Sequence, residues 1–404
     1  MRPLATTLTL LLLLVMVAPA SAQFATNWNR SAGTSPSTTP SFFGGTTERG
    51  FAYGLVGGNE RVYVPSRNGG NSVRILNGAT GADIGTLDLT GVTGGLFVIN
   101  DAGVSDDGVI FVCNLTIDAS ASPFKCYTWA TEGAVPSTAL SFSTATDTRF
   151  GDKITVSGSC SDNSALIWAV DADGSLGVYK FGTADNCATF TQTAGSPIIL
   201  NNTDGVPAGS VGSTGSIPDV APLAGGGFWQ TGAGNSPRLF SATGDFEGEI
   251  PGSLLPTGTT GLKVIQPGNG NTYLITNRYG DGYCQMVDVT NGPGSATALT
   301  PSGSTPSIGT NSTSGNADVD VKVDGAGNVT VYCMSANNGV ASFTYTPTLP
   351  VELTAFEGTL SGNAARLAWA TASETNNAGF YVEHSANGSD FRDVHFAPGH
   401  GTTL

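Results

Sequence analysis

The sequence predicts an all-β protein, a six-bladed (alternatively seven-bladed) β-propeller followed by a truncated β-sandwich. Residues 48–91 contain four short strand-like runs, separated by turns rich in glycine and asparagine. Similar units follow along the chain, and their first strands begin near residues 49, 97, 150, 218, 261 and 317. This spacing is close to the roughly 40–50 residues of a propeller blade, with some blades extended by loops.

Within the first unit we expect strands at residues 51–56, 61–65, 72–76 and 84–89. The sixth unit shows only three strands, at 318–323, 328–332 and 340–345. A propeller must close, since open sheet edges favour aggregation. We therefore expect the run at 24–28 to complete the sixth blade as its outermost strand. The alternative is a seventh, degenerate blade within residues 187–216.

The N-terminus has the pattern of a secretory signal peptide, which we assign to residues 1–22. Arg2 precedes an apolar run at 8–17, and the A-x-A site at 20–22 precedes Gln23. The run is too short to span a bilayer, and no later stretch approaches that length. We expect an exported protein that is secreted or attached to the cell surface, without membrane insertion.

Composition limits the partners. The formal net charge is −15, which argues against nucleic acid and against anionic lipid. Charged residues are only 12% of the chain, against about 25% in typical domains. We therefore expect a surface built largely from Ser, Thr, Asn and Gly.

Export favours oxidation of the six cysteines. Of the 15 possible connectivities, we favour three pairs. They are Cys113 with Cys126 across a hairpin, Cys160 with Cys187 within one blade, and Cys284 with Cys333 between successive blades. No C-x-x-C spacing or neighbouring histidine favours a metal instead, so we expect no metal at the cysteines.

The repeated strand-and-turn units of the propeller end near residue 348. An alternating strand at 365–370 and a hairpin around 386–389 predict the first half of a small β-sandwich with Trp369 in its core. Such sandwiches have roughly 100 residues, so we expect that three strands are missing.

This segment resembles the fibronectin type III-like module that precedes the sorting domain of bacterial type IX secretion cargo. The resemblance rests on LPVELT at 349–354, on WATASETNNAGF at 369–380 and on VEHSANG at 382–388. Ala370 stands where threonine is usual. The resemblance implies a partial module at 348–404, and we expect the propeller to occupy 23–347 and the chain to carry no sorting domain.

The body resembles a family of secreted bacterial propellers of unknown function. The resemblance rests on ERGFAY at 48–53, LNGATGAD at 76–83, VSDDG at 104–108 and RFGD at 149–152. It implies the fold but no activity.

Catalytic motifs are scarce. All three histidines, His384, His395 and His400, lie in the C-terminal segment, so the propeller has no histidine-dependent triad or zinc site. Polar residues recur where the innermost strands begin, around the central channel. The candidate ligand-binding residues are Glu48, Arg49, Asp101, Asp152, Asp219, Lys263, Asp318 and Asp320.

These residues leave two functions open. The first is a secreted or cell-surface binding or structural protein, without enzymatic activity, whose ligand is a polysaccharide or a protein. The alternative is a carboxylate-dependent or calcium-dependent enzyme acting on glycans or lactones, since converging carboxylates can hold calcium or act as acid and base on a glycoside. No cofactor is required, although calcium is compatible with the carboxylates. A third interpretation of the same residues is structural, with carboxylates pairing with Arg49, Arg149 and Lys263.

Overall fold

The structure is a computed structural model that describes residues 11–16, 24–172, 176–201, 214–255, 258–268, 270–299, 303–312, 316–346, 352–361, 364–385 and 391–403. The chain forms two compact units. Phe24–Tyr345 is one unit, and the other contains residues from both ends of the chain. The predicted domain boundary at 347/348 lies outside the described residues.

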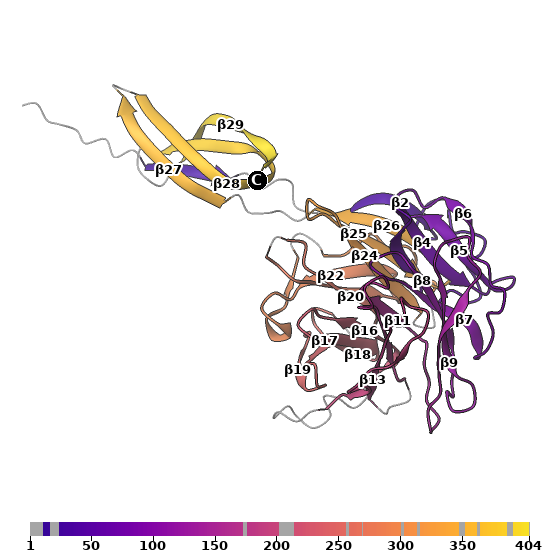
Figure 1. The fold of residues 1–404 in the computed structure, drawn as a ribbon. Helices are drawn as coiled ribbons and strands as arrows, with labels where there is room; N and C mark the ends of the chain where they lie inside the picture. Colours follow the sequence, from indigo (N-terminus) through magenta and orange to yellow (C-terminus); the bar gives the residue numbers. More distant parts are fainter. Residues whose placement is uncertain are drawn as a thin grey trace, which may run out of the picture. The chain divides into compact units, whose positions relative to one another are not determined.

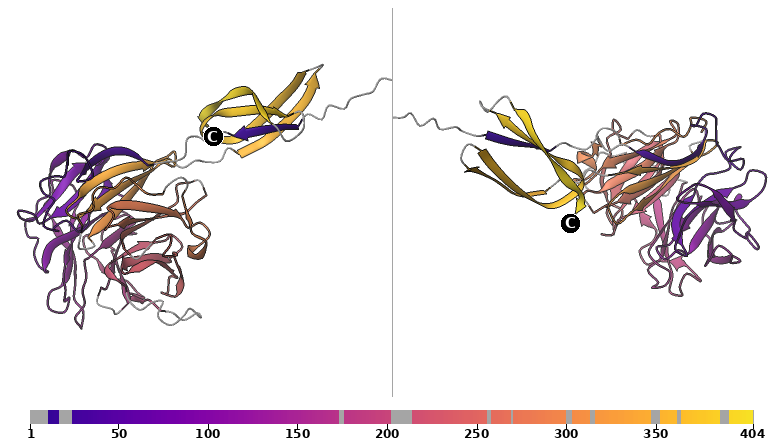
Figure 2. Two further views of the ribbon diagram at one scale, coloured as in Figure 1. Left: turned by 180° about the vertical axis from the view of Figure 1, so that it is seen from behind. Right: turned by 90° about the horizontal axis from the view of Figure 1, so that it is seen from above.

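The first unit is a six-bladed β-propeller, which confirms the predicted blade count (Figures 1 and 2). Blade 1 comprises β3 (Ala52–Val56), β4 (Asn59–Ser66), β5 (Ser72–Asn77) and β6 (Asp83–Thr86). Blade 2 comprises β7 (Phe97–Val104), β8 (Ile110–Leu115), β9 (Phe124–Trp129) and β10 (Ser137–Phe142). Blade 3 comprises β11 (Ile154–Ser157), β12 (Leu166–Val170), β13 (Gly177–Gly182), β14 (Thr191–Gln192) and β15 (Ile198–Ile199).

The other three blades repeat the antiparallel order. Blade 4 comprises β16 (Ser216–Pro222), β17 (Phe228–Ala233), β18 (Asn235–Phe240) and β19 (Phe246–Glu249). Blade 5 comprises β20 (Thr259–Ile265), β21 (Tyr273–Arg278), β22 (Tyr283–Asp288) and β23 (Thr297–Ala298), with a 3-10 turn η1 (Pro293–Ser295) before β23. Blade 6 comprises β24 (Ala317–Val323), β25 (Val329–Ser335), β26 (Gly339–Tyr345) and β2 (Ala25–Ser31).

Strand β2 closes the ring, as the sequence predicts. It pairs antiparallel with β26, from Ala25 opposite Thr344 to Ser31 opposite Gly339 (Figure 1). The seventh-blade alternative is not realised in the described part of 187–216, because β14 and β15 both pair with β13 of blade 3. Residues 202–213 of that stretch are not among the described residues.

The core lies in layers between successive blades, because both faces of most blades are covered by a neighbour. Phe111 and Phe181 pack between blades 2 and 3, and Trp168 packs with Phe228 between blades 3 and 4. Trp129 and Trp229 are fully buried. The alternating apolar residues of the strands therefore fill these layers, as their pattern predicts.

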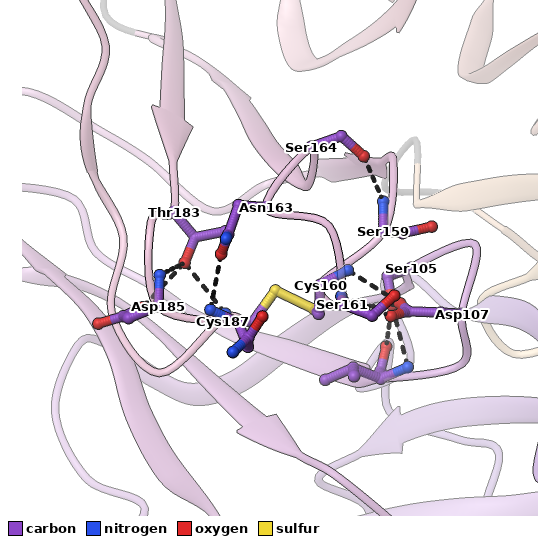
Figure 3. The surroundings of a disulfide bond; sticks show 12 residues. Ser105, Asp107, Ser159, Cys160, Ser161, Asn163, Ser164, Thr183, Asp185 and Cys187 are labelled. Atoms are coloured by element: carbon purple, nitrogen blue, oxygen red, sulfur yellow. Dashed lines mark hydrogen bonds between the residues drawn. A yellow bond between two sulfur atoms is a disulfide. The ribbon is translucent and has the colours of Figure 1, made fainter.

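Two disulfides are present in the described residues. Cys160 bonds to Cys187 within blade 3 (Figure 3), and Cys284 of β22 bonds to Cys333 of β25 in the next blade. Both were expected. Beside the first, the Asp107 carboxylate accepts hydrogen bonds from the backbone N–H groups of Cys160 and Ser161, at 3.0 and 2.8 Å.

The third predicted disulfide is wrong, because Cys113 and Cys126 are free, buried thiols. They lie directly opposite each other on β8 and β9. The Cβ atoms of such cross-strand pairs are about 4.5–5.5 Å apart, whereas those of a disulfide are about 3.5–4.5 Å apart. The hairpin brings the two cysteines together, but its regular backbone spacing does not favour a bond.

The second unit is an antiparallel sheet of β1 (Leu11–Met16), β27 (Glu352–Ser361), β28 (Ala364–Ser385) and β29 (Arg392–Thr403). Trp369 is half-buried and contacts Phe380, with ring centroids 5.7 Å apart. The predicted hairpin at 386–389 lies outside the described residues. The signal peptide, the sandwich and the fibronectin type III-like module remain predictions.

Candidate functional site

The channel carboxylates join neighbouring blades. Each of four aspartates on an innermost strand accepts a backbone N–H from the innermost strand of the next blade, or from the residue just before it. The pairs are Asp101 with Ile154 at 2.7 Å, Asp219 with Leu262 at 2.7 Å, Asp318 with Phe51 at 3.1 Å, and Asp320 with Tyr53 at 2.8 Å. These bonds join blade 2 to 3, blade 4 to 5 and blade 6 to 1.

Threonines make the intervening joints. The Thr155 hydroxyl donates to the carbonyl oxygen of Val220 at 2.6 Å, and the Thr260 hydroxyl donates to that of Ala317 at 3.3 Å. At the joint between blades 1 and 2, Gly50 lies against the Asp101 carboxylate, and a Cβ at Gly50 would be 1.7 Å from Oδ1. A closed ring of side-chain contacts therefore surrounds the channel.

Two lysines partly neutralise these aspartates. Lys153 Nζ is 2.8 Å from Asp318 Oδ2, and it also donates to the carbonyl oxygen of Arg49 at 2.7 Å. Lys263 Nζ is 3.2 Å from Asp320 Oδ1. Burial disfavours the Lys263 ammonium, but the carboxylates of Asp320, Asp219 and Asp318 outweigh burial and raise the pKa of this lysine.

The structure brings together three of the predicted aspartates, Asp101, Asp219 and Asp318. Burial, reinforced by the neighbouring carboxylates, raises the pKa of Asp101 well above its usual value. Burial and Asp318 raise the pKa of Asp219 to about 7. A pKa near neutrality would suit a general acid, but Asp219 is only 4% exposed, so a substrate has no access to it.

Glu48 lies apart from this cluster. Its buried carboxylate accepts hydrogen bonds from the Gly44 N–H at 3.1 Å, the Thr47 hydroxyl at 2.5 Å and the Ser66 hydroxyl at 2.7 Å. Burial raises its pKa even though these bonds oppose the shift. Glu48 therefore orders the loop before β3.

Asp152 pairs with two arginines. Arg149 contacts both of its carboxylate oxygens at 2.6 Å, and Arg49 Nη2 is 3.2 Å from Oδ1. Arg67 lies nearby and stacks on Phe97, with its guanidinium carbon 3.8 Å from the ring centroid. This arginine cluster (Arg49, Arg67 and Arg149) lies where the innermost strands begin.

A cavity of about 250 Å³ lies in the channel towards the other ends of the innermost strands. Tyr53, Val104 and Val156 contribute to its wall, together with the ion pair of Lys263 and Asp320. A larger groove of about 580 Å³ lies between blades 4 and 5. Its lining includes Leu223, Ser241, Glu247, Val264 and Gln266.

The described residues contain no group of three or more histidine, cysteine, aspartate or glutamate side chains arranged to hold a metal ion. The turn at 105–109, a potential calcium loop by composition, is a hairpin turn in which the Gly108 N–H donates to the Ser105 carbonyl. In the same part of the chain there is no helix of the length and hydropathy that crossing a membrane would require.

The comparisons with known proteins support the fold. The chain is similar to a DUF4623 family protein from Bacteroides eggerthii, with 18% identity and a TM-score of 0.61, over 82% of this chain and 77% of that one. This neighbour and the six blades fit the propeller of unknown function that the sequence resembles. No protein-family profile and no curated protein sequence matches the chain.

Two sugar-bound lectins are more distant. SapL1 lectin in complex with alpha methyl fucoside has 12% identity over 80% of this chain and 96% of that one. Aleuria aurantia lectin in complex with alpha-methyl-L-fucoside has 13% identity over 82% and 97%. Both have a TM-score of 0.43, which is too low to support an argument about this chain.

Sequence reasoning missed Lys153, Arg67 and Phe97 as parts of the channel. One signal was available for Lys153. It stands two residues after Gly151, as Lys263 stands two residues after Gly261, and both glycines have positive φ values, 88° and 71°. No comparable pattern marks Arg67, which reaches the channel from the loop after β4.

Proposed function

We propose that this protein is an extracellular binding protein without enzymatic activity, and that its propeller binds a polysaccharide. A protein ligand is the alternative. The sandwich would act as a spacer towards a surface anchor, in line with the resemblance to type IX secretion cargo.

The observation that carries the proposal is the use of the channel carboxylates. A glycosidase needs two carboxyl groups facing the scissile bond, and calcium needs several exposed oxygen ligands. Asp101, Asp219, Asp318 and Asp320 instead accept backbone N–H groups of the next blade. All four are nearly inaccessible, with 8% exposure at most.

Two further features support the proposal, one concerning the location of the protein and one concerning ligand binding. The two disulfides suit an oxidising compartment. The groove between blades 4 and 5 has a volume within the range of about 300–1,000 Å³ that is common for small-ligand sites.

The test compares binding with turnover. The exported protein is applied to immobilised bacterial and plant polysaccharides, and the same polysaccharides and a set of lactones are assayed for new reducing ends or ring opening. We expect retention on at least one polysaccharide without turnover. Turnover that Asp219→Asn abolishes would establish the carboxylate-dependent enzyme instead. Absence of retention on every polysaccharide would contradict the proposal and favour a protein ligand.

A further inference from the structure

The arginine cluster brings three guanidinium groups together in an acidic protein, and two of them, Arg49 and Arg149, contact the carboxylate of Asp152. Arg49 precedes β3, Arg67 follows β4, and Arg149 precedes β11, so two blades contribute to it. The chain has only 16 lysine and arginine residues against 31 acidic ones. Three of these basic residues lie together in the cluster, which makes a local concentration of positive charge in a molecule that is negative overall.

The acids around the cluster balance only part of its charge, because three guanidinium groups stand against two carboxylates, those of Asp152 and Glu48. Asp152 contacts both Arg149 and Arg49, while the Glu48 carboxylate accepts hydrogen bonds from Gly44, Thr47 and Ser66 and attracts Arg67 through its charge. Arg67 donates to the Ile99 carbonyl at 3.2 Å and to the Asn100 side-chain oxygen at 3.3 Å, both of them uncharged groups. Partly buried cations that anions balance only in part are costly, so an external anion would stabilise the cluster.

The arginines are fixed in place and partly accessible. Phe97 lies under the Arg67 guanidinium and within 5.7 Å of that of Arg49. Arg49 Nε is buried without a hydrogen-bond partner, although the side chain as a whole retains 13% exposure, and Arg149 retains 29%. Donors held in fixed positions lose little entropy when a ligand binds.

The electrostatic shifts agree with this geometry. Burial lowers the pKa of Arg67 to about 10, the positive charge of Arg49 adds to the effect, and the Glu48 carboxylate opposes it. Burial also lowers the pKa of Arg49, where Asp152 opposes the shift and Arg149 adds to it. A bound anion would relieve both.

We propose that the arginine cluster binds the carboxylate of an acidic sugar unit. A planar carboxylate matches the fork of a guanidinium, and Asp152 already occupies two guanidinium groups in this way. The net charge of −15 disfavours a dense polyanion, so the ligand carries isolated carboxylates on an otherwise neutral polysaccharide. The choice of a sugar rests on the proposed function, whereas the choice of a carboxylate rests on the cluster.

The test titrates the full chain with methyl glucuronide and with methyl glucoside, which differ in the carboxylate alone, and follows binding by calorimetry at low and at physiological salt. We expect binding of the glucuronide that is at least tenfold tighter than that of the glucoside and that weakens with salt. Arg67→Gln and Arg149→Gln should each lower glucuronide affinity at least tenfold. Using two variants keeps the test valid if one fails to fold.

Arg278→Gln is the matched control, because it removes the same charge from an ion pair with Asp281 in blade 5, and its affinity should be unchanged. Equal affinity for the two sugars, insensitive to the cluster variants, would overturn the carboxylate site while leaving the proposed binding function intact. Acetate binding as tightly as the glucuronide would overturn recognition of the sugar. No binding of either sugar, by a chain that is retained on a neutral polysaccharide, would also overturn the site alone.

Discussion

At the scale of single residues, the contact between Gly50 and Asp101 determines how blades 1 and 2 meet. No side chain larger than hydrogen fits at residue 50, because a Cβ there would lie 1.7 Å from Asp101 Oδ1 and 2.4 Å from Cγ. Glycine is needed at residue 50 because the backbone before β3 lies directly against the Asp101 carboxylate of the neighbouring blade.

We predict that Gly50→Ala destabilises the propeller by about 3 kcal/mol or more, because the buried carboxylate must move from its hydrogen bond with Ile154. The measurement is the midpoint of urea unfolding. Gly85→Ala is the control, since a Cβ at Gly85 meets nothing within 4 Å and should change stability by less than about 1 kcal/mol. Equal midpoints for the two variants would show that the blades do not meet as described.

Asp101 also predicts a pH dependence. Its folded-state pKa is raised well above its usual value, chiefly by burial. As pH rises above about 4, the unfolded chain loses this proton while the folded protein keeps it, so stability falls until the folded-state pKa is passed. Asp219, whose folded-state pKa is about 7, adds a similar fall in stability between about pH 4 and neutrality.

We predict that Asp101→Asn reduces the loss of melting temperature between pH 5 and pH 8. The variant keeps an acceptor for the Ile154 N–H and replaces Oδ1, which has no hydrogen-bond partner, with a neutral amide. The exposed Asp147→Asn serves as a charge-matched control and should keep the wild-type slope. A slope in Asp101→Asn identical to wild type would show that Asp101 is ionised throughout.

At the scale of elements, strand β2 fastens the ring by more than its pairing with β26. The Trp28 indole N–H donates to the Gly78 carbonyl at 2.8 Å, and its ring packs against Gly81, where a Cβ would lie 2.6 Å from it. Arg30 donates to the Gly81 carbonyl at 2.8 Å. These contacts join the outer strand of blade 6 to the β5–β6 turn of blade 1.

We predict that Trp28→Ala costs about 3–5 kcal/mol, because a buried aromatic ring is lost at the closure. Trp28→Phe should cost less, since it keeps most of the ring but loses the hydrogen bond to Gly78, which is worth about 1 kcal/mol. Chemical denaturation measures both variants. A cost below about 1 kcal/mol for Trp28→Ala would mean that closure depends on the backbone pairing of β2 alone.

The hairpin of β8 and β9 gives a prediction about thiols. Cys113 and Cys126 are fully buried, and burial raises the pKa of both thiols, which makes them unreactive in the folded state. We expect no reaction of the native protein with a thiol reagent and two reactive thiols after denaturation without reductant. If the denatured protein has no reactive thiols, Cys113 and Cys126 are bonded to each other, as the sequence analysis predicted.

At the scale of the whole molecule, polar and charged side chains on the innermost strands join the blades of the propeller into a closed ring. Aspartates alternate with threonines at the joints from blade 2 onwards, and Lys153 and Lys263 balance part of the charge near the axis. The arginine cluster and the cavity with Lys263 lie at opposite ends of the innermost strands. Charged side chains therefore lie at both ends of the ring.

We predict that millimolar calcium does not change the melting temperature of chelator-treated protein. The aspartates that could hold calcium are buried and already accept backbone N–H groups. A ligand of the folded state at 100 times its dissociation constant would add about 2.7 kcal/mol, which scanning calorimetry detects readily. A clear rise, lost in Asp320→Asn, would instead identify a metal site and revive the enzyme hypothesis.

The sequence determined most of the fold. Turn residues at regular intervals gave the blade count, and the short run before the first blade predicted the closing strand because the sixth unit lacked one. These features are local, and each strand displays its own pattern of apolar residues. The candidate residues were found for the same reason, since each lies on an innermost strand or in the few residues before one.

What those residues do was decided only by the tertiary structure. Asp101 and Asp219 look alike in the sequence whether they face a ligand or a neighbouring backbone, because that choice depends on residues more than forty positions away, Ile154 and Leu262. Arg149 comes to Arg49 only when the ring brings blade 3 close to blade 1, where both arginines contact Asp152. The backbone spacing of β8 and β9 likewise decided that Cys113 and Cys126 remain free. The sequence by itself determined the blades and their order. The ring brought charges from separate blades together, because closure fixes distances that no local pattern encodes.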